Sequence, residues 1–154
     1  MTPEDVRTIV QDLDTTSVSA EEEAWLKLKP LGSAVVPYLA EFYTRCGKWQ
    51  GRASLLFHSI RFARDSEAAF QLGVEALQDK STVVRYRACS LLAYSLRVDA
   101  LQHLDPLLRH SDAKTSADAK AAIQAIRTRN HHLFVDRNRT GQSFWVVNPG
   151  DSEA

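Results

Sequence analysis

The chain has 154 residues and balances 19 lysines and arginines against 19 aspartates and glutamates, so its formal net charge is zero. Apolar residues make up 44% of the chain and charged residues 25%, the usual composition of one globular domain. The charge balance argues against a general polyanion binder, because such proteins need an excess of cations to displace counterions from phosphates.

The sequence shows no signal for export or membrane insertion. No apolar run approaches the roughly 18 residues that a bilayer span needs, and the acidic start Met1–Asp5 is unlike a signal peptide. Cys46 and Cys89 stand alone rather than in a metal-binding or disulfide motif. We therefore expect a cytoplasmic protein with two buried thiols and neither a cofactor nor a metal.

Two capped helices open the chain. Thr2 is the expected N-cap of a helix that ends near Leu13. Ser19 and Glu22 have the spacing of a capping box and predict a second helix, which ends at the proline and glycine of 30–32. Together these helices are expected to cap the N-terminal end of the fold.

From residue 30 the chain repeats a helical hairpin. Apolar residues recur at helical spacing after Ala53, Ala88 and Ala119, with shifts of 35 and 31 residues between the copies. These stretches predict the first helix of each hairpin, and Ser81 is the expected cap of the helix that contains Ala88. The expected second helices are Ser33–Arg45, Ser66–Gln78 and Asp99–His110.

One copy resembles the HEAT family, of the short bacterial kind found in phycobilisome lyases. The motifs are Leu77-x-Asp79-x-Ser81-x-x-Val84-Arg85-x-x-Ala88-x-x-Leu91-Leu92 and Leu31-Gly32-x-Ala34-Val35-Val36-Pro37-x-Leu39. In the other copies Trp49-Gln50 and Thr115-Ser116 stand where Val84-Arg85 stand. The resemblance covers roughly residues 20–129 and carries no catalytic residues. It implies a right-handed superhelix whose second helices line the concave face, with Arg85 reaching an Asp or a carbonyl of an adjacent loop.

At the end of the chain the spacing of the apolar residues is no longer that of a helix. Residues 132–136 and 143–147 are typical of two short strands joined by a turn. This hairpin either covers the open apolar end of the array or presents Phe144 and Trp145 to a partner. The expected fold is thus a single all-α domain with a small C-terminal β-hairpin: cap helices 1–29, repeats 30–129, hairpin 130–150 and a frayed tail 151–154.

Catalytic motifs are absent from the sequence. There is no GxSxG, no glycine-rich phosphate loop and no HExxH. His103 and His110 lie about 10 Å apart along a helix, too far to share a metal without a third element. We expect His58 to be a hydrogen-bonded core or groove residue, and residues 131–132 to satisfy carbonyls at a helix end. No enzymatic activity is expected.

Opposed blocks of charge make up the neutral total. The net charge is −4 over 1–29, +4 over 30–64, −2 over 65–112, +4 over 113–139 and −2 over 140–154. Glu41, Glu75 and Asp105 are either ordinary solvated carboxylates or an acidic row on the concave face. The expected partner-binding residues are Tyr38, Glu41, Arg45, Gln71, Glu75, Gln78, Gln102, Asp105 and Arg109. The basic residues expected on the convex side or at repeat junctions are Arg52, Arg61, Arg64, Arg85, Arg87, Arg97 and Lys120.

Three functions remain open. The first is a non-enzymatic module that binds one protein partner on its concave face, the partner having a basic surface. Such a module would be a bacterial immunity (toxin-neutralising) protein or an adaptor. The second is nucleic-acid backbone binding, which requires Arg45, Lys48 and Arg52 to cluster with Arg127 and Arg129. The third is a lyase-like or chaperone role. The first is preferred, with neither membrane nor nucleic acid as partner and with the oligomeric state open.

Overall fold

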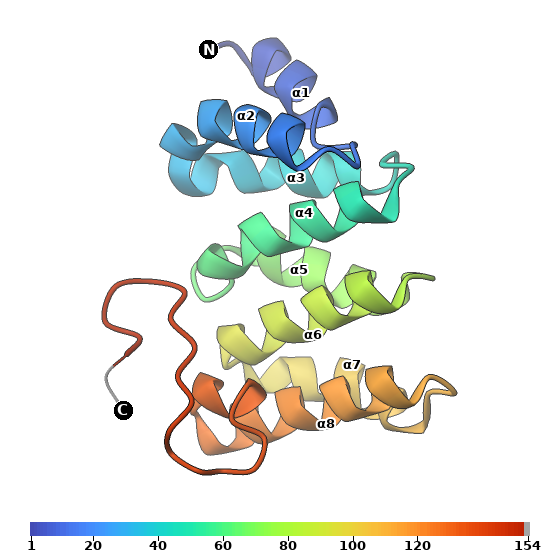
Figure 1. Ribbon diagram of the computed structural model, residues 1–154, viewed down its shortest axis with the longest axis vertical. Helices are drawn as coiled ribbons and strands as arrows, with labels where there is room; N and C mark the ends of the chain where they lie inside the picture. The colour runs from blue at the N-terminus through green and yellow to red at the C-terminus, as the bar shows by residue number, and fades with distance from the viewer. Residues whose placement is uncertain (153–154) are drawn as a thin grey trace.

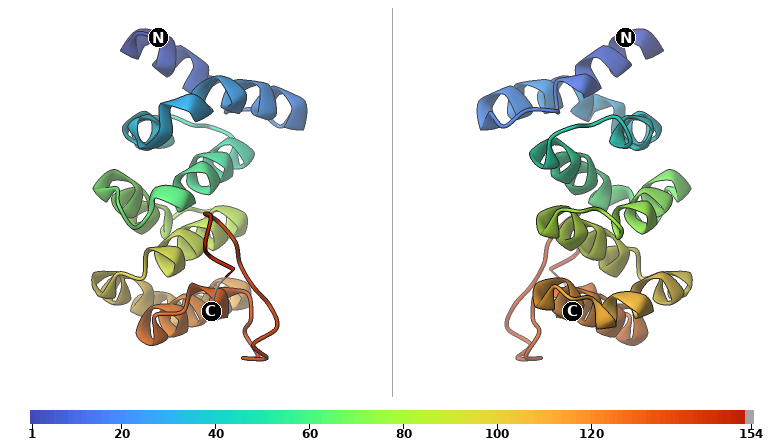
Figure 2. Two further views of the ribbon diagram at one scale, coloured as in Figure 1. Left: turned by 90° about the vertical axis from the view of Figure 1, so that its left-hand side faces the viewer. Right: turned by 90° about the vertical axis from the view of Figure 1, so that its right-hand side faces the viewer.

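Pairs of helices stack in two rows in the computed structural model, which describes residues 1–152 (Figure 1). The α-helices are α1 (Pro3–Gln11), α2 (Val18–Leu28), α3 (Val36–Tyr43), α4 (Trp49–Ser59), α5 (Glu67–Ala76), α6 (Thr82–Ser95), α7 (Leu101–Leu104) and α8 (Ala113–Thr128). Short 3-10 turns occupy Lys29–Val35, Ile60–Phe62, Val98–Ala100, Asp105–Arg109 and His131–Phe134. Figure 2 shows α2, α4, α6 and α8 as one row and the odd-numbered helices as the other.

Side-chain caps set where the helices begin. Thr2 caps α1 as the sequence predicts, and it does so in a reciprocal capping box with Asp5. The predicted cap Ser81 accepts a hydrogen bond from the third amide of α6. At α2 the prediction is wrong, because Ser17 rather than Ser19 caps the helix.

Two arginines mark the true register of the repeats. Arg52 and Arg85 each occupy the fourth position of their helices, α4 and α6, and lie 33 residues apart. The predicted shift of 35 residues is therefore wrong at this copy. The pair Gly51–Arg52, and not Trp49–Gln50, stands where Val84–Arg85 stands.

Each of these arginines joins two successive loops. Arg85 donates to the Asp79 carbonyl at 2.8 Å, in the loop before its own helix, and to the Asp112 carboxylate at 2.9 Å, in the loop before α8. The contact expected of Arg85 is thus confirmed. Arg52 donates in the same way to the Gly47 carbonyl at 2.9 Å and to the Asp79 carboxylate at 2.8 Å.

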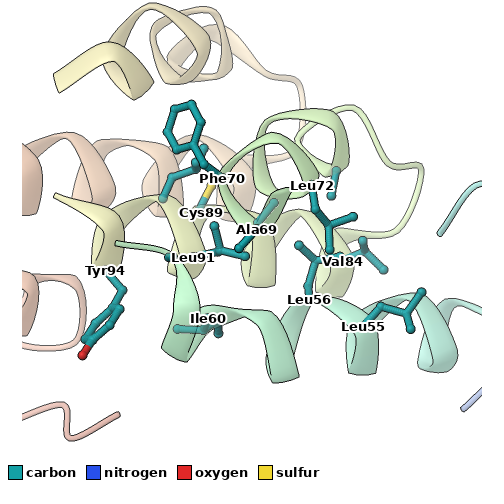
Figure 3. Close-up of a cluster of buried hydrophobic side chains, with 14 of the residues drawn as sticks. Leu55, Leu56, Ile60, Ala69, Phe70, Leu72, Val84, Cys89, Leu91 and Tyr94 are labelled. Atoms are coloured by element: carbon teal, nitrogen blue, oxygen red, sulfur yellow. The ribbon is translucent and has the colours of Figure 1, made fainter. Parts of the chain in front are cut away.

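A continuous apolar core runs between the two rows (Figure 3). Leu56 of α4 and Leu91 of α6 have no exposed area, and Leu72 of α5 has 1%. The helices approach closely at Gly73 of α5, where a Cβ atom would lie 2.7 Å from Leu91 Cδ2. Burial of such side chains is the main source of stability in a helical stack.

The predicted C-terminal β-hairpin is wrong, since residues 1–152 form no strand. After α8 and the turn His131–Phe134, residues 135–152 fold back over the ends of α4 and α6 (Figure 2); we call them the C-terminal strap. The amides of the strap donate hydrogen bonds to side chains and not to the carbonyl groups of a neighbouring strand. The Asp136 carboxylate accepts from the amides of Thr140 at 3.0 Å and Gly141 at 2.7 Å.

The expected frayed tail is also ordered where the structure describes it. Asp151 is buried and accepts hydrogen bonds from the hydroxyl of Tyr94 at 2.8 Å and from the amides of Val147 and Asn148. Tyr94 lies at the edge of the core cluster (Figure 3). Residues 153–154 of the predicted tail lie outside the described residues.

Candidate functional site

Two adjoining recesses follow α4 along one face of the row. The upper recess, of about 340 Å³, lies between the α1–α2 loop, α2, α4 and the start of α6. The lower recess, of about 370 Å³, lies between the ends of α2 and α4, the middle of α6 and the strap. Phe57, His58 and Arg87 line both, so we call them the upper and lower halves of the α4 groove.

Stacked rings build the ridge between the two halves. The His58 ring lies face to face with Trp25 of α2 at 3.8 Å between ring centroids, and its Nε2 lies 2.5 Å from Glu21 Oε1. Arg87 of α6 places its guanidinium 4.8 Å from the centre of the Phe57 ring. His58 is therefore a hydrogen-bonded groove residue, as predicted.

The His58 imidazole is held neutral at the ridge. Burial lowers the pKa of His58 below its ordinary value of 6.5, although the hydrogen bond and the charge of Glu21 act in the opposite direction. The nearby positive charge of Arg87 also lowers it. At neutral pH the Glu21 carboxylate therefore lies beside a neutral His58 ring that donates a hydrogen bond, and not beside a charged imidazolium.

The lower half of the groove is basic. Lys29, Arg61 and Arg87 line it, and no carboxylate does so among residues 1–152. None of these three cations forms an ion pair within the described part of the chain. A recess with three cations and no counter-charge attracts an anionic ligand.

Exposed apolar side chains gather in the same groove. Trp49 is 44% exposed and Phe57 is 51% exposed, and both line the upper half. Val135 and Val146 of the strap are exposed beside the lower half, where the Trp145 ring is half-buried. Exposed rings next to unpaired cations favour a ligand that is both flat and negatively charged.

The nine residues predicted to bind a partner lie elsewhere. They belong to α3, α5, α7, the turn Asp105–Arg109 and, for Arg45 and Gln78, the loops that follow α3 and α5, and none of them lines the α4 groove. Glu41 pairs with Arg7 of α1 at 3.3 Å, and Arg7 also lies over the Tyr38 ring. Glu75 and Asp105 are exposed. The role of these residues in partner binding stays a prediction.

The C-terminal aromatics have separate environments. Trp145 packs against Tyr94 and Phe134 and lines the lower half of the groove. Phe144 is 51% exposed and contacts only the edge of His132 among the ring contacts of the described residues. Only Trp145, of the two predicted interface aromatics, belongs to the groove.

The basic cluster required for the nucleic-acid alternative does not form as predicted. Arg45 and Lys48 lie in the loop before α4, whereas Arg127 and Arg129 lie at the far end of α8 (Figure 1). Arg52 is buried and bonded to the loops at its own repeat junction. The cations that line the lower half of the groove are instead Lys29, Arg61 and Arg87. Arg61 and Arg87 were expected on the convex side or at junctions, with no signal of a shared recess.

Both thiols are part of the core. Burial raises the pKa of Cys46 and of Cys89 to about 12, so both stay protonated at neutral pH. The described residues contain no group of three or more histidine, cysteine, aspartate or glutamate side chains placed to bind a metal. Of the helices formed by residues 1–152, none has the length and apolar character needed to cross a membrane.

The helical arrangement is shared with a known protein. No family model matches the chain, and no curated protein sequence matches it. The structure of human deoxyhypusine hydroxylase in complex with glycerol matches with a TM-score of 0.66 and 17% sequence identity, over 81% of this chain and 44% of that one. The chain therefore spans less than half the length of that protein, and the likeness shows the fold.

This likeness corrects two predictions. The sequence predicted a protein without enzymatic activity and, more narrowly, a non-enzymatic module that binds a protein partner. Both rested on the helical-repeat architecture and on missing catalytic motifs, yet the same architecture is that of an enzyme in the solved structure. The fold thus gives no ground for either prediction.

Proposed function

We propose that this protein binds single-stranded nucleic acid in the α4 groove. The observation that carries the proposal is the lower half of the groove, where Lys29, Arg61 and Arg87 meet aromatic rings and, among residues 1–152, no carboxylate. Proteins that bind single strands combine cations along the backbone with aromatic side chains on which the bases stack. Both parts are present here.

The groove suits a single strand better than a duplex. The exposed side chains of Trp49 and Phe57 offer stacking surfaces, and a duplex hides the faces of its bases whereas a single strand exposes them. Three cations also suit a short backbone segment. The neutral charge of the chain still argues against bulk coating of a duplex.

The upper half supplies polar groups beside the rings. Gln50 lies one residue from Trp49 and lines the same recess, as do Ser54 and Glu21. Amide, hydroxyl and carboxylate groups can hydrogen-bond to the edge of an unstacked base. Since Glu21 already contacts His58, Gln50 and Ser54 are the groups proposed to contact the base.

We also propose that the repeats are HEAT-like and that the protein works in the cytoplasm. The paired contacts of Arg52 and Arg85 support a HEAT-like stack. The buried free thiols of Cys46 and Cys89 support work in the reducing cytoplasm.

Fluorescence anisotropy tests the proposed function. A labelled single strand of mixed sequence and about 20 nucleotides is titrated with the protein, beside the duplex of the same sequence. We expect tighter binding of the single strand. Its logarithmic affinity should fall with the logarithm of salt concentration with a slope of about −2, from three phosphate contacts at about 0.7 each. No binding to the strand at low salt, or binding that salt leaves unchanged, would contradict the proposal.

A further inference from the structure

Two adjacent histidines hydrogen-bond to the backbone of a single strap residue, Trp145. His131 Nε2 lies 2.8 Å from the Trp145 carbonyl oxygen, and the Trp145 amide nitrogen lies 2.8 Å from His132 Nδ1. A carbonyl oxygen only accepts, so His131 carries a proton on Nε2. An amide N–H only donates, so His132 has no proton on Nδ1.

The remaining ring nitrogens make both imidazoles neutral. Arg64 Nη2 lies 3.2 Å from His131 Nδ1, and because a guanidinium only donates, this nitrogen must carry a lone pair. His132 Nε2 is buried and has no hydrogen-bond partner among residues 1–152. Both residues are only 7% exposed, and their ring centroids lie 4.0 Å apart.

The charges that face this pair do not favour a second proton. Arg64, from the turn after α4, is positive and also donates to the Tyr94 carbonyl of α6 at 2.7 Å. Asp151 of the strap is the facing carboxylate, but it already accepts from Tyr94 and two strap amides. Burial lowers the pKa of His131 below its ordinary 6.5, and His132 and Arg64 act in the same direction, against the Trp145 carbonyl and Asp151.

We propose that His131 and His132 form an acid-sensitive latch that holds Trp145 in the wall of the α4 groove and releases it on protonation. A proton taken from solvent onto His132 Nδ1 turns the acceptor of the Trp145 amide into a donor. A proton on His131 Nδ1 faces the Arg64 guanidinium. Either event removes a contact and adds a buried charge.

The direction of the pH dependence follows from the neutral docked state. The ordinary pKa of His131 is 6.5, whereas the docked His131 holds its second proton less readily, so its pKa is lowered. Docking is therefore fully present above about pH 6.5 and weakens as the pH falls below it. Release opens the lower half of the groove on the side that Trp145 and Val146 close.

The latch does not depend on what the groove binds, so its test needs no ligand. The full chain is labelled with 5-fluorotryptophan, and its three tryptophans give three ¹⁹F NMR signals, of which Trp145→Phe identifies one. Between pH 8 and pH 5 we expect the Trp145 signal to move to the solvent-exposed position while circular dichroism keeps its helical signal. A Trp145 signal that stays at its docked position down to pH 5, or moves only when the helices unfold, overturns the latch.

Substitutions that keep the hydrogen-bonding atoms but cannot be protonated sharpen the test. Asn in His132→Asn offers an acceptor near the position of Nδ1, and Gln in His131→Gln offers a donor near that of Nε2. Each variant is expected to shift the midpoint of the Trp145 transition to lower pH. His103→Gln on α7 is the matched control and should leave the midpoint unchanged. A midpoint that neither latch variant shifts overturns the proposal.

Discussion

Arg52 donates from Nε and Nη2 to the two carboxylate oxygens of Asp79, at 2.8 and 3.2 Å, 27 residues further along the chain. The Tyr43 hydroxyl donates to the same carboxylate at 2.6 Å. Arg85 repeats the contact with Asp112, also 27 residues away. One side-chain pair per junction thus joins successive helical hairpins and fixes the surface on which the α4 groove lies.

Removal of one partner of this pair should be costly. Asp79→Ala leaves the Arg52 guanidinium buried without its counter-charge, and we expect a loss of about 3–5 kcal/mol in the free energy of unfolding. Urea denaturation measures it. Asp99→Ala is the control, because Asp99 is exposed and Arg97 keeps its second partner Glu67, so the change should cost less than about 1 kcal/mol. Equal costs for the two variants would show that Asp79 does not hold the junction.

The same pair predicts sensitivity to acid. Burial alone would raise the pKa of Asp79, but the hydrogen bonds from Arg52 and Tyr43 outweigh it and hold the pKa below its ordinary 3.8. A lowered folded-state pKa gives stability that is present above pH 3.8 and is lost as the pH falls through the folded value. The melting temperature should therefore drop as the pH falls below 3.8, and drop less in Asp79→Asn. Equal drops would contradict the role of Asp79.

Gly51 of α4 should not tolerate a side chain, because the α1–α2 loop packs directly against it. A Cβ atom there would lie 2.8 Å from Asp14 Cα and 3.0 Å from the Leu13 carbonyl oxygen, and backbone atoms cannot give way cheaply. We expect Gly51→Ala to lower the free energy of unfolding by about 1–3 kcal/mol. Gly47→Ala is the control, since its Cβ would meet only Asp14 Oδ2, at 3.8 Å. Comparable stability of the two variants would show that the loop does not pack against α4 as described.

Ala88 tests the close packing of α6. It is fully buried, and Ala88→Leu would force extra volume into the core at a cost of about 1–3 kcal/mol. Thermal unfolding followed by circular dichroism measures the change. Ala113→Leu at the exposed start of α8 should change the melting temperature little. A neutral Ala88→Leu would contradict the packing at this helix.

Phe57 tests the stacking surface of the groove. Phe57→Ala should weaken binding of a single strand by about 1–3 kcal/mol, the usual contribution of one stacked base. Phe144→Ala is a matched control, because both rings are 51% exposed but Phe144 does not line the groove. Anisotropy titrations give both values. Equal losses would show that the effect is not specific to the groove.

Local signals predicted the helices well and the repeat register less well. Thr2 and Ser81 cap helices as predicted, because a cap depends on residues three or four positions away. The equivalence of Arg52 and Arg85 was missed because Trp49–Gln50 resembles Val84–Arg85 only in spacing. The contact with Asp79 that defines the equivalence is tertiary.

The sequence did not reveal the strap or the groove, because the contacts that form them join residues far apart in the chain. The alternation around Phe144 and Val146 is typical of a strand, but His132, Asp136 and Asp151 take the amides that a ladder would use. Residues of the groove come from α2, α4, α6 and the strap, so no single segment displays it. The sequence signal that could have indicated the groove is the presence of cationic and aromatic residues on the first helix of each hairpin.

The most direct test of the account is the salt dependence of single-strand binding in two double variants of equal charge. Lys29→Glu with Arg61→Glu reverses two groove cations, whereas Arg45→Glu with Arg109→Glu reverses two exposed cations outside the groove. If the groove holds the strand, the groove variant binds much more weakly and its salt slope shrinks by about 1.4, at about 0.7 per lost phosphate contact. The control variant should keep the slope of the unaltered protein. Equal affinities and equal slopes in the two variants would contradict nucleic-acid binding by the α4 groove.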